Sequence, residues 1–444
     1  MKLNSKEFTL KTGLKVYAVR KENLPIFQMN FIVRCGAAHD PESLHGLASL
    51  TFDLIESGPE DMNEIEVAST FEREGVVFST NTAFSYSSMA FKSLSSGFEN
   101  ALRIFKKVIF EPAFRSEDVD REKELTVNAF MIDFSEPSKV AEYVFQEKLY
   151  EGHPVGHDVD GSIKSVRKIH RDDVVEFYNN CFRVENSFIV VVSDLEDLSF
   201  LDDYFGSWNA SGLKDRVVPE FDREQKMRVI LVNMPVSQSV IRMGFVGVNR
   251  KSPDFNALRV ADYILGGSGF SSRLVEEVRT KRGYSYDVHS LIDPGFPFKN
   301  TIVPGRFSIN LETSVEKTNQ AIDTVMEVVK KFVEDGITEK ELKEAKQYYE
   351  GSLPRKLETY SSISAARLYS VLFDMNVNYF LNDLEEIKNL TVQDVNRVIS
   401  EFFSPEKFTT IIVTDLTKFK LTSEFFKGVE LEEYPYENLL KGAS

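Results

Sequence analysis

The feature that most constrains the fold is an internal repeat whose two copies lie half a chain apart in the 444-residue sequence. The stretch SVRKIHRDDVVEFYNNCFRVENSFIVVVSDLED, which ends at Asp197, matches EIKNLTVQDVNRVISEFFSPEKFTTIIVTDLTK, which ends at Lys418. Each copy has the pattern of an amphipathic helix, a short connection and an apolar, β-branched strand that ends in Asp-Leu. Because the same unit closes each half, the sequence predicts two homologous domains.

The order of the patterns within each half indicates the fold class. Segments that alternate apolar and polar residues come first, and longer segments with helical periodicity follow. Separate runs of strands and helices favour α+β domains, each a mostly antiparallel β-sheet with helices packed on one face, over a doubly wound sheet. We expect the domains at residues 1–210 and 227–444, joined by an exposed linker at 211–226 that is rich in Gly, Pro and charge.

Local signals predict where several helices begin and end. Asp40 and Pro41 have the types expected for an N-cap and a first helical residue, and Gly58 for the end of that helix. The spacing of a capping box predicts two further helix starts, at Asn63 with Glu66 and at Thr338 with Glu341.

Composition indicates a soluble protein that folds without disulfides. A chain of this length with 42% apolar residues can fill two cores, so we expect Cys35 and Cys181 to be reduced, buried thiols in an intracellular setting. The N-terminal residues have no apolar stretch of the kind a signal peptide needs, and no apolar run is long enough to span a membrane. These features predict a cytoplasmic location.

The charge balance excludes some partners. With 69 acidic and 53 basic residues the formal charge is −16, and so acidic a surface repels nucleic acid and anionic membranes. The acidity either only keeps the protein in solution or attracts basic peptides.

One segment resembles a zinc-binding helix but lacks the residues that would bind zinc and activate water. GAAHDPESLHGLASLTFDLIESG, residues 36–58, resembles the helix on which the pitrilysin, insulinase and mitochondrial-processing-peptidase family carries its inverted zinc motif, H-x-x-E-H. There, two histidines one helical turn apart bind zinc and the glutamate activates the metal-bound water. The corresponding residues here are Ser49, Phe52 and Asp53. A hydroxyl is a weak zinc ligand, a phenyl ring accepts no proton, and one aspartate cannot hold a catalytic zinc alone.

The resemblance also implies that the third zinc ligand is missing. The family's downstream glutamate lies in a segment that Lys123–Pro137 resembles, and Asn128 and Ala129 stand where acids are expected. His153 and His157 offer no substitute, because Pro154 and Gly156 prevent a regular helix from presenting them together. We therefore expect no metal and no cofactor in this chain, with zinc in a partner subunit.

The second half retains the other signature of the family. Residues 243–288 contain a glycine-rich turn, a helix whose acidic residues precede its basic ones, and an R-x-x-x-Y motif formed by Arg282 and Tyr286. The turn consists of Gly266, Gly267, Ser268 and Gly269, and it matches neither register of a nucleotide-binding loop. In relatives built as pairs, the Arg and Tyr hold the substrate backbone or stabilise the tetrahedral intermediate in the opposite active site. Without the resemblance, a surface Arg and a core Tyr would be the simpler interpretation.

The resemblance spans essentially the whole chain and implies a fold like that of mitochondrial processing peptidase and the LuxS metalloenzyme. It implies a zinc-dependent endopeptidase family, of which this chain alone is predicted to be an inactive member. We expect a subunit that binds peptide substrate and completes the active site of a zinc-bearing paralogue, in a heterodimer or with a second copy of itself. Two alternatives stay open: a structural or peptide-binding scaffold without proteolysis, and a divergent peptidase with an unrecognised metal site.

Overall fold

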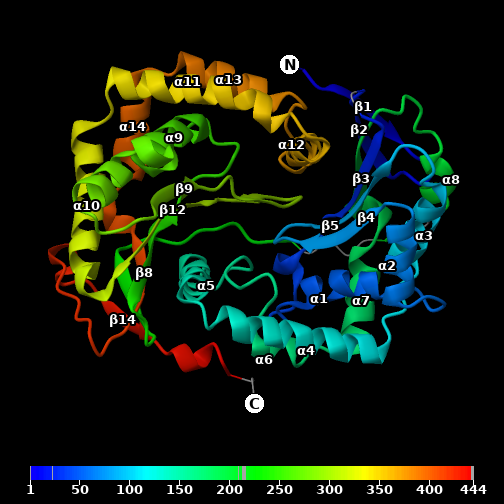
Figure 1. The fold of residues 1–444 in the computed structure, drawn as a ribbon, viewed down its shortest axis with the longest axis horizontal. Coiled ribbons are helices and arrows are strands. Elements are labelled where there is room, and N and C mark those ends of the chain that lie inside the picture. Colours follow the sequence, from blue (N-terminus) through cyan, green and yellow to red (C-terminus); the bar gives the residue numbers. More distant parts are fainter. Residues whose placement is uncertain (1, 23, 209, 213–216, 442–444) are drawn as a thin grey trace.

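Two six-stranded sheets form the framework of the computed structural model, which describes residues 2–22, 24–208, 210–212 and 217–441 (Figure 1). The first sheet has the spatial order β1 (Asn4–Thr9), β2 (Lys15–Arg20), β6 (Ser187–Ser193), β3 (Ile26–Val33), β5 (Ser87–Leu94) and β4 (Val77–Thr82). The second has the order β14 (Leu431–Tyr434), β7 (Arg228–Asn233), β13 (Thr409–Thr414), β8 (Gln238–Val246), β12 (Arg306–Ser314) and β9 (Val288–Ile292). Neighbours pair antiparallel except β2 with β6 and β7 with both β13 and β14.

The topology confirms the predicted pair of homologous α+β domains. The order β2-β6-β3-β5-β4 in the first sheet corresponds to β7-β13-β8-β12-β9 in the second. The repeated sequence forms α7 (Arg171–Cys181) with β6 in one domain and α14 (Val392–Phe402) with β13 in the other. Every residue of β6 and of β13 is buried, so each central strand is covered on both faces of its sheet.

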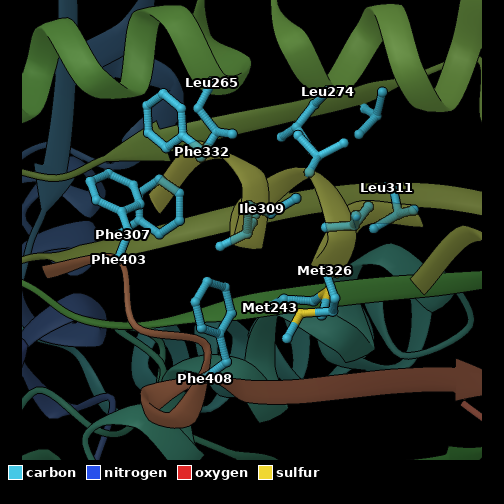
Figure 2. Packing of buried hydrophobic residues seen from close by; sticks show 14 of the residues in the cluster. Met243, Leu265, Leu274, Phe307, Ile309, Leu311, Met326, Phe332, Phe403 and Phe408 are labelled. Atoms are coloured by element: carbon cyan, nitrogen blue, oxygen red, sulfur yellow. The ribbon is translucent and has the colours of Figure 1, made fainter. Parts of the chain in front are cut away.

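Helices of the same domain cover one face of each sheet. In the first domain these include α1 (Leu47–Asp53), α2 (Glu64–Arg73), α3 (Glu99–Phe110) and α8 (Leu201–Phe205). In the second they include α9 (Phe255–Asp262) and α10 (Thr318–Asp335), with α13 (Tyr379–Asn389) packed on α9. Figure 2 shows aromatic rings meeting in this second core, where Phe403 packs on Phe307 and Phe332 with ring centroids 4.8 and 5.6 Å away.

The opposite face of each sheet is covered by a helix from the other domain. α5 (Pro137–Leu149) belongs to the first half of the chain but packs on β8 and β13. α12 (Tyr360–Leu372) belongs to the second half but packs on β2, β3 and β6 (Figure 1). This reciprocal exchange joins the two domains through apolar cores on both sides.

Polar contacts fix the position of α12 on the first sheet. The Tyr360 hydroxyl lies 2.6 Å from the carbonyl oxygens of both Lys21 and Leu24, and its one proton can be donated to either. Asn30 Nδ2 on β3 donates to Ser364 Oγ at 2.8 Å. The sequence predicted helices on one face of each sheet, whereas the second layer depends on contacts between opposite halves of the chain.

Local signals gave mixed results at helix ends. The capping boxes at Asn63/Glu66 and Thr338/Glu341 are confirmed. The helix expected to begin after Asp40 begins instead at Leu47, and Asp40 caps it from a distance by accepting hydrogen bonds from the Gly46 and Ala48 amides at 2.7 and 2.8 Å. The prediction was wrong because this carboxylate reaches the helix end across an intervening turn.

The expectation of two free thiols is also wrong. Cys35 follows β3, Cys181 ends α7, and the structure joins them in a disulfide with their Cα atoms 5.8 Å apart. Their separation of 146 residues in the sequence concealed this proximity. The two cysteines therefore do not indicate a reducing compartment.

The connection between the halves lies partly within the described residues. Residues 213–216 are outside them, and residues 217–226 form neither helix nor strand. Val218 is buried and the Phe221 ring packs on Tyr150 at 5.4 Å, so part of the predicted linker lies against the first domain. The predicted boundaries stay a prediction. No described helix is long and apolar enough to cross a lipid bilayer.

Candidate functional site

The three residues at the degenerate zinc-motif positions have separate surroundings. Ser49 and Asp53 lie one turn apart on α1, while Phe52 is completely buried in the first-domain core. Ser49 Oγ donates to Asp160 Oδ1 at 2.6 Å and lies 3.4 Å from Asp53 Oδ2. The hydroxyl therefore serves as a donor to carboxylates, and a neutral hydroxyl of this kind is a weak zinc ligand.

A hydroxyl from β4 binds the other side of this cluster. Thr80 Oγ1 donates toward Asp53 Oδ1 at 3.2 Å and Glu56 Oε1 at 2.9 Å, and the Thr80 amide donates to Glu56 Oε1 at 2.8 Å. Burial, reinforced by the charges of Glu122 and Asp160, raises the pKa of Asp53 to about 7. Burial also raises the pKa of Glu122. Hydrogen bonds from the hydroxyl groups of Ser49 and Thr80 thus connect carboxylates that would otherwise repel one another.

The segment expected to lack the third ligand lies on α4 (Ser116–Asp133). Asn128 and Ala129 are both exposed, and Ala129, which has no ligand atom, lines a cavity next to Asp160. Glu122 was not predicted from the sequence. It precedes Ala129 by two turns of α4, a spacing that places both residues on the same helix face and could have identified it. Asp160, whose loop carries no motif, was not predicted either.

The donor set does not fit a catalytic zinc. A serine that donates its proton, a phenylalanine in the core and an alanine stand where ligands and base would be needed. His153 contacts the Pro219 carbonyl at 2.9 Å, whereas His157 stacks on His45 with ring centroids 3.8 Å apart. Among the described residues, no three His, Cys, Asp or Glu side chains form a group that could hold a metal ion.

The cavity beside α1 lies between the two domains and has a volume of about 440 Å³. Its first-domain wall comes from α4, α5 and residues 157–160, and its second-domain wall includes Phe296 and Arg306. Burial raises the pKa of Asp158 in this cavity to about 6. Arg306 forms ion pairs with Glu142 and with Asp293, so the lining has an excess of acidic groups.

The glycine-rich segment begins inside a helix. Gly266 and Gly267 end η4 (Tyr263–Gly267), a wide helical turn that continues α9, and Gly269 opens η5 (Gly269–Ser271) with a φ of 65°. A Cβ on Gly266 would lie 2.4 Å from Ser290 Oγ and 2.5 Å from Ser290 N, so glycine lets this turn touch β9. One on Gly267 would lie 2.9 Å from Asp262 Oδ2. Close packing accounts for Gly266, whereas Ser268 and Gly269 remain near the surface.

Arg282 and Tyr286 follow η6 (Val275–Lys281), and each has its own partner. Arg282 Nη1 pairs with Glu277 Oε2 at 2.5 Å and also donates to the Glu277 carbonyl at 3.1 Å. The Tyr286 side chain is 80% exposed, and the Arg279 guanidinium lies 4.0 Å from its ring centroid. A tyrosine this exposed contributes little to the core, which contradicts the simpler interpretation of Tyr286 as a core residue.

Comparison with known family models identifies the same family in both halves. The model for insulinase (peptidase family M16) matches residues 15–161, and that for the peptidase M16 inactive domain matches residues 168–349.

Individual relatives cover nearly the whole chain. An uncharacterized zinc protease of Bacillus subtilis, YmxG, is 22% identical over 92% of this chain and 98% of its own length. A protein of Helicobacter pylori named non-peptidase homolog YmxG is 23% identical over 91% and 93%. The crystal structure of a peptidase M16 inactive domain from Pseudomonas fluorescens matches with a TM-score of 0.86 and 25% identity, covering 95% of this chain and 99% of that one. Since these relatives have opposite descriptions, the local chemistry must decide the function of this chain.

Proposed function

The chain belongs to peptidase family M16, and on that premise we propose that it is a non-catalytic subunit of a heterodimeric zinc peptidase. Its second domain would bind the peptide substrate and supply Arg282 and Tyr286 to the active site of a zinc-bearing paralogue. Zinc would reside in that partner. Neither nucleic acid nor a membrane would take part, and the complex would act in the cytoplasm.

The observation that carries the proposal is the contrast between the two motifs. Around α1, Ser49 and Asp53 are engaged in hydrogen bonds with Asp160 and Thr80, and no water-activating base is present at Phe52. In the second domain, Tyr286 extends into solvent from the loop that also carries Arg282. A guanidinium and a phenol can donate to a developing oxyanion without losing a proton at neutral pH.

The surroundings of Arg282 are compatible with binding a substrate. Its ion pair with Glu277 leaves the side chain one-third exposed, and Glu327 lies 4.0 Å from Nη2. A guanidinium has five N–H groups, so contacts with Glu277 and Glu327 still leave donors for a substrate carbonyl or an oxyanion. The exposed Tyr286 ring, backed by Arg279, offers both an apolar face and a hydroxyl to a docked peptide.

Reconstitution with a zinc-bearing M16 paralogue from the same organism tests the proposal. We expect Arg282→Ala and Tyr286→Phe each to lower kcat of the complex by roughly 10²–10³ while the dimer and the partner's zinc content are retained. Lys281→Ala is the matched control, because it removes a neighbouring exposed cation that also pairs with Glu277.

Other outcomes would select the alternatives. Unchanged kinetics of both variants in an intact complex would make the pair structural and favour the scaffold function. Peptide hydrolysis by the purified chain, with one zinc retained through dialysis and activity lost on chelation, would favour the divergent peptidase.

A further inference from the structure

A second cavity, of about 420 Å³, lies in the second domain at the position that corresponds to the cavity beside α1. The helices around the two cavities correspond in length: α4 and α11 (Glu339–Lys356) both have 18 residues, and α5 and α12 both have 13. The starts of α4 and α11 are as far apart in the sequence as the starts of α5 and α12. The two cavities are therefore duplicates at the level of the fold.

The correspondence extends to individual lining residues. Pairs with this same sequence separation line the two cavities: Thr126 and Tyr349, Phe130 and Leu353, Asp133 and Lys356, Gln146 and Tyr369. At the third pair an acid in the first cavity is replaced by a base in the second. The side-chain charge at this equivalent position is therefore negative in the first cavity and positive in the second.

The rest of the second lining is also basic. Arg250 and Arg259 share a single carboxylate, Asp383, with N–O distances of 2.5 and 3.2 Å. Arg250 is only 6% exposed, so this shared ion pair is largely withdrawn from solvent. The remaining acid, Asp262, accepts a hydrogen bond from Ser290 Oγ at 2.6 Å, and burial raises its pKa to about 7. The cavity lining thus retains a positive charge in a protein whose net charge is −16.

Lys356 supplies an ammonium group that is not directly paired with a carboxylate. It lines the cavity and forms no hydrogen bond or ion pair within the described part of the chain. Partial burial of its ammonium group and the nearby Arg259 charge lower the pKa of Lys356, and the opposite charge of Asp383 offsets this only in part. An anion in the cavity would relieve both effects, because it would pair with the ammonium group and offset the guanidinium.

Tyrosines form the walls between these charges. Tyr263 stacks on Tyr348 with ring centroids 4.5 Å apart, and Tyr369 lies 5.1 Å from Tyr379. Such a cavity has the size and the mixture of flat apolar surface and few charged groups that suit a small organic ligand or a short peptide segment. Rings of this kind pack on peptide planes and aliphatic side chains, which a hydrated inorganic ion does not offer.

We propose that this second cavity binds the carboxylate of a peptide, borne by an acidic side chain or by the C-terminus, with Lys356 and Arg259 as the cationic groups that contact it. The inference deepens the peptide-binding part of the proposed function and rests on it. It adds that the duplicated cavity selects acidic rather than basic segments. Because it concerns this chain alone, it can be tested without a zinc-bearing partner.

The experiment measures binding to the purified full chain by fluorescence anisotropy with labelled, N-acetylated hexapeptides. One is Gly-Ser-Glu-Glu-Ser-Gly amide, the second replaces both Glu by Gln, and the third is the Gln peptide with a free C-terminus. We expect the first or the third to bind and the amidated Gln peptide not to bind. Which of the two binds identifies the source of the carboxylate.

Two variants at one position connect the binding to the cavity. Lys356→Met should weaken the acidic probe by about tenfold or more, and Lys356→Glu, which places an acid where the first domain has Asp133, should abolish binding. Lys343→Glu, an equal charge change at another exposed position of α11, should leave the affinity unchanged. Circular dichroism and Tm of each variant show that the fold is retained.

Three results would overturn the assignment: equal binding of all three peptides, binding that survives Lys356→Glu, or tighter binding of inorganic phosphate with the same Lys356 dependence. If the acidic peptides do not bind as expected, the proposed contribution of Arg282 and Tyr286 to a partner's active site is not affected. Conversely, if Arg282 and Tyr286 do not contribute to catalysis in the complex, peptide binding to the isolated chain is still expected.

Discussion

Asp53 offers the sharpest test of how the former zinc helix is stabilised. Its carboxyl group lies among Glu56, Glu122 and Asp160, and burial with these charges raises its pKa to about 7. Asp53→Asn has nearly the same shape, stays neutral at every pH and can still accept the hydrogen bond from Thr80 Oγ1. The substitution therefore isolates the cost of ionising this buried group.

The direction of the effect follows from the two pKa values. Below about pH 4 the carboxyl is protonated in both the folded and the unfolded chain, so its ionisation costs nothing. Between about pH 4 and 7 the unfolded chain loses the proton while the folded chain keeps it, so the free energy of unfolding falls as pH rises. Above pH 7 the full penalty is present, roughly 4 kcal/mol for a pKa raised from its ordinary value near 4 to about 7.

Asp53→Asn should thus stabilise the protein at pH 8 by up to ~4 kcal/mol, with the gain shrinking toward zero near pH 4–5. Urea unfolding at pH 5, 6, 7 and 8 measures it through the single tryptophan, Trp208, which stacks on Phe110 in the first-domain core. Asp120→Asn, at an exposed position of α4, is the matched control. Parallel curves for wild type and Asp53→Asn from pH 5 to 8 would refute the reasoning.

Two further predictions concern the motifs. We expect no peptide hydrolysis from the purified chain that carries the three substitutions Ser49→His, Phe52→Glu and Asp53→His. Adding Ala129→Glu should increase the zinc content measured by elemental analysis. A robustly active triple variant would show that the third ligand lies elsewhere. Gly266→Ala should lower the free energy of unfolding by ~1–3 kcal/mol, since its methyl group would collide with the β9 backbone; an unchanged unfolding midpoint would show that the turn can shift.

The sequence alone determined the duplicated architecture, and it predicts the absence of a zinc site. A repeat constrains the fold because equal patterns form equal supersecondary units, and β6 and β13 indeed occupy matching positions. Ligand chemistry is likewise local: the Ser49 hydroxyl is a weak zinc ligand and the Phe52 ring accepts no proton in any environment. The capping boxes of α2 and α11 are short-range signals, so the starts of these helices could be predicted.

The tertiary structure decided everything that depends on residues distant in the sequence. The exchange of α5 and α12, the Cys35–Cys181 disulfide and the distant cap of α1 by Asp40 all join segments whose own patterns do not reveal their partner. The same holds for the raised pKa of Asp53, which arises because acidic side chains from separate elements lie around one helix face. Hydrophobic periodicity specifies which face of an element is buried, whereas only tertiary packing specifies which other element covers that face. The two cavities of opposite charge lie between such elements and therefore could not be predicted from the sequence.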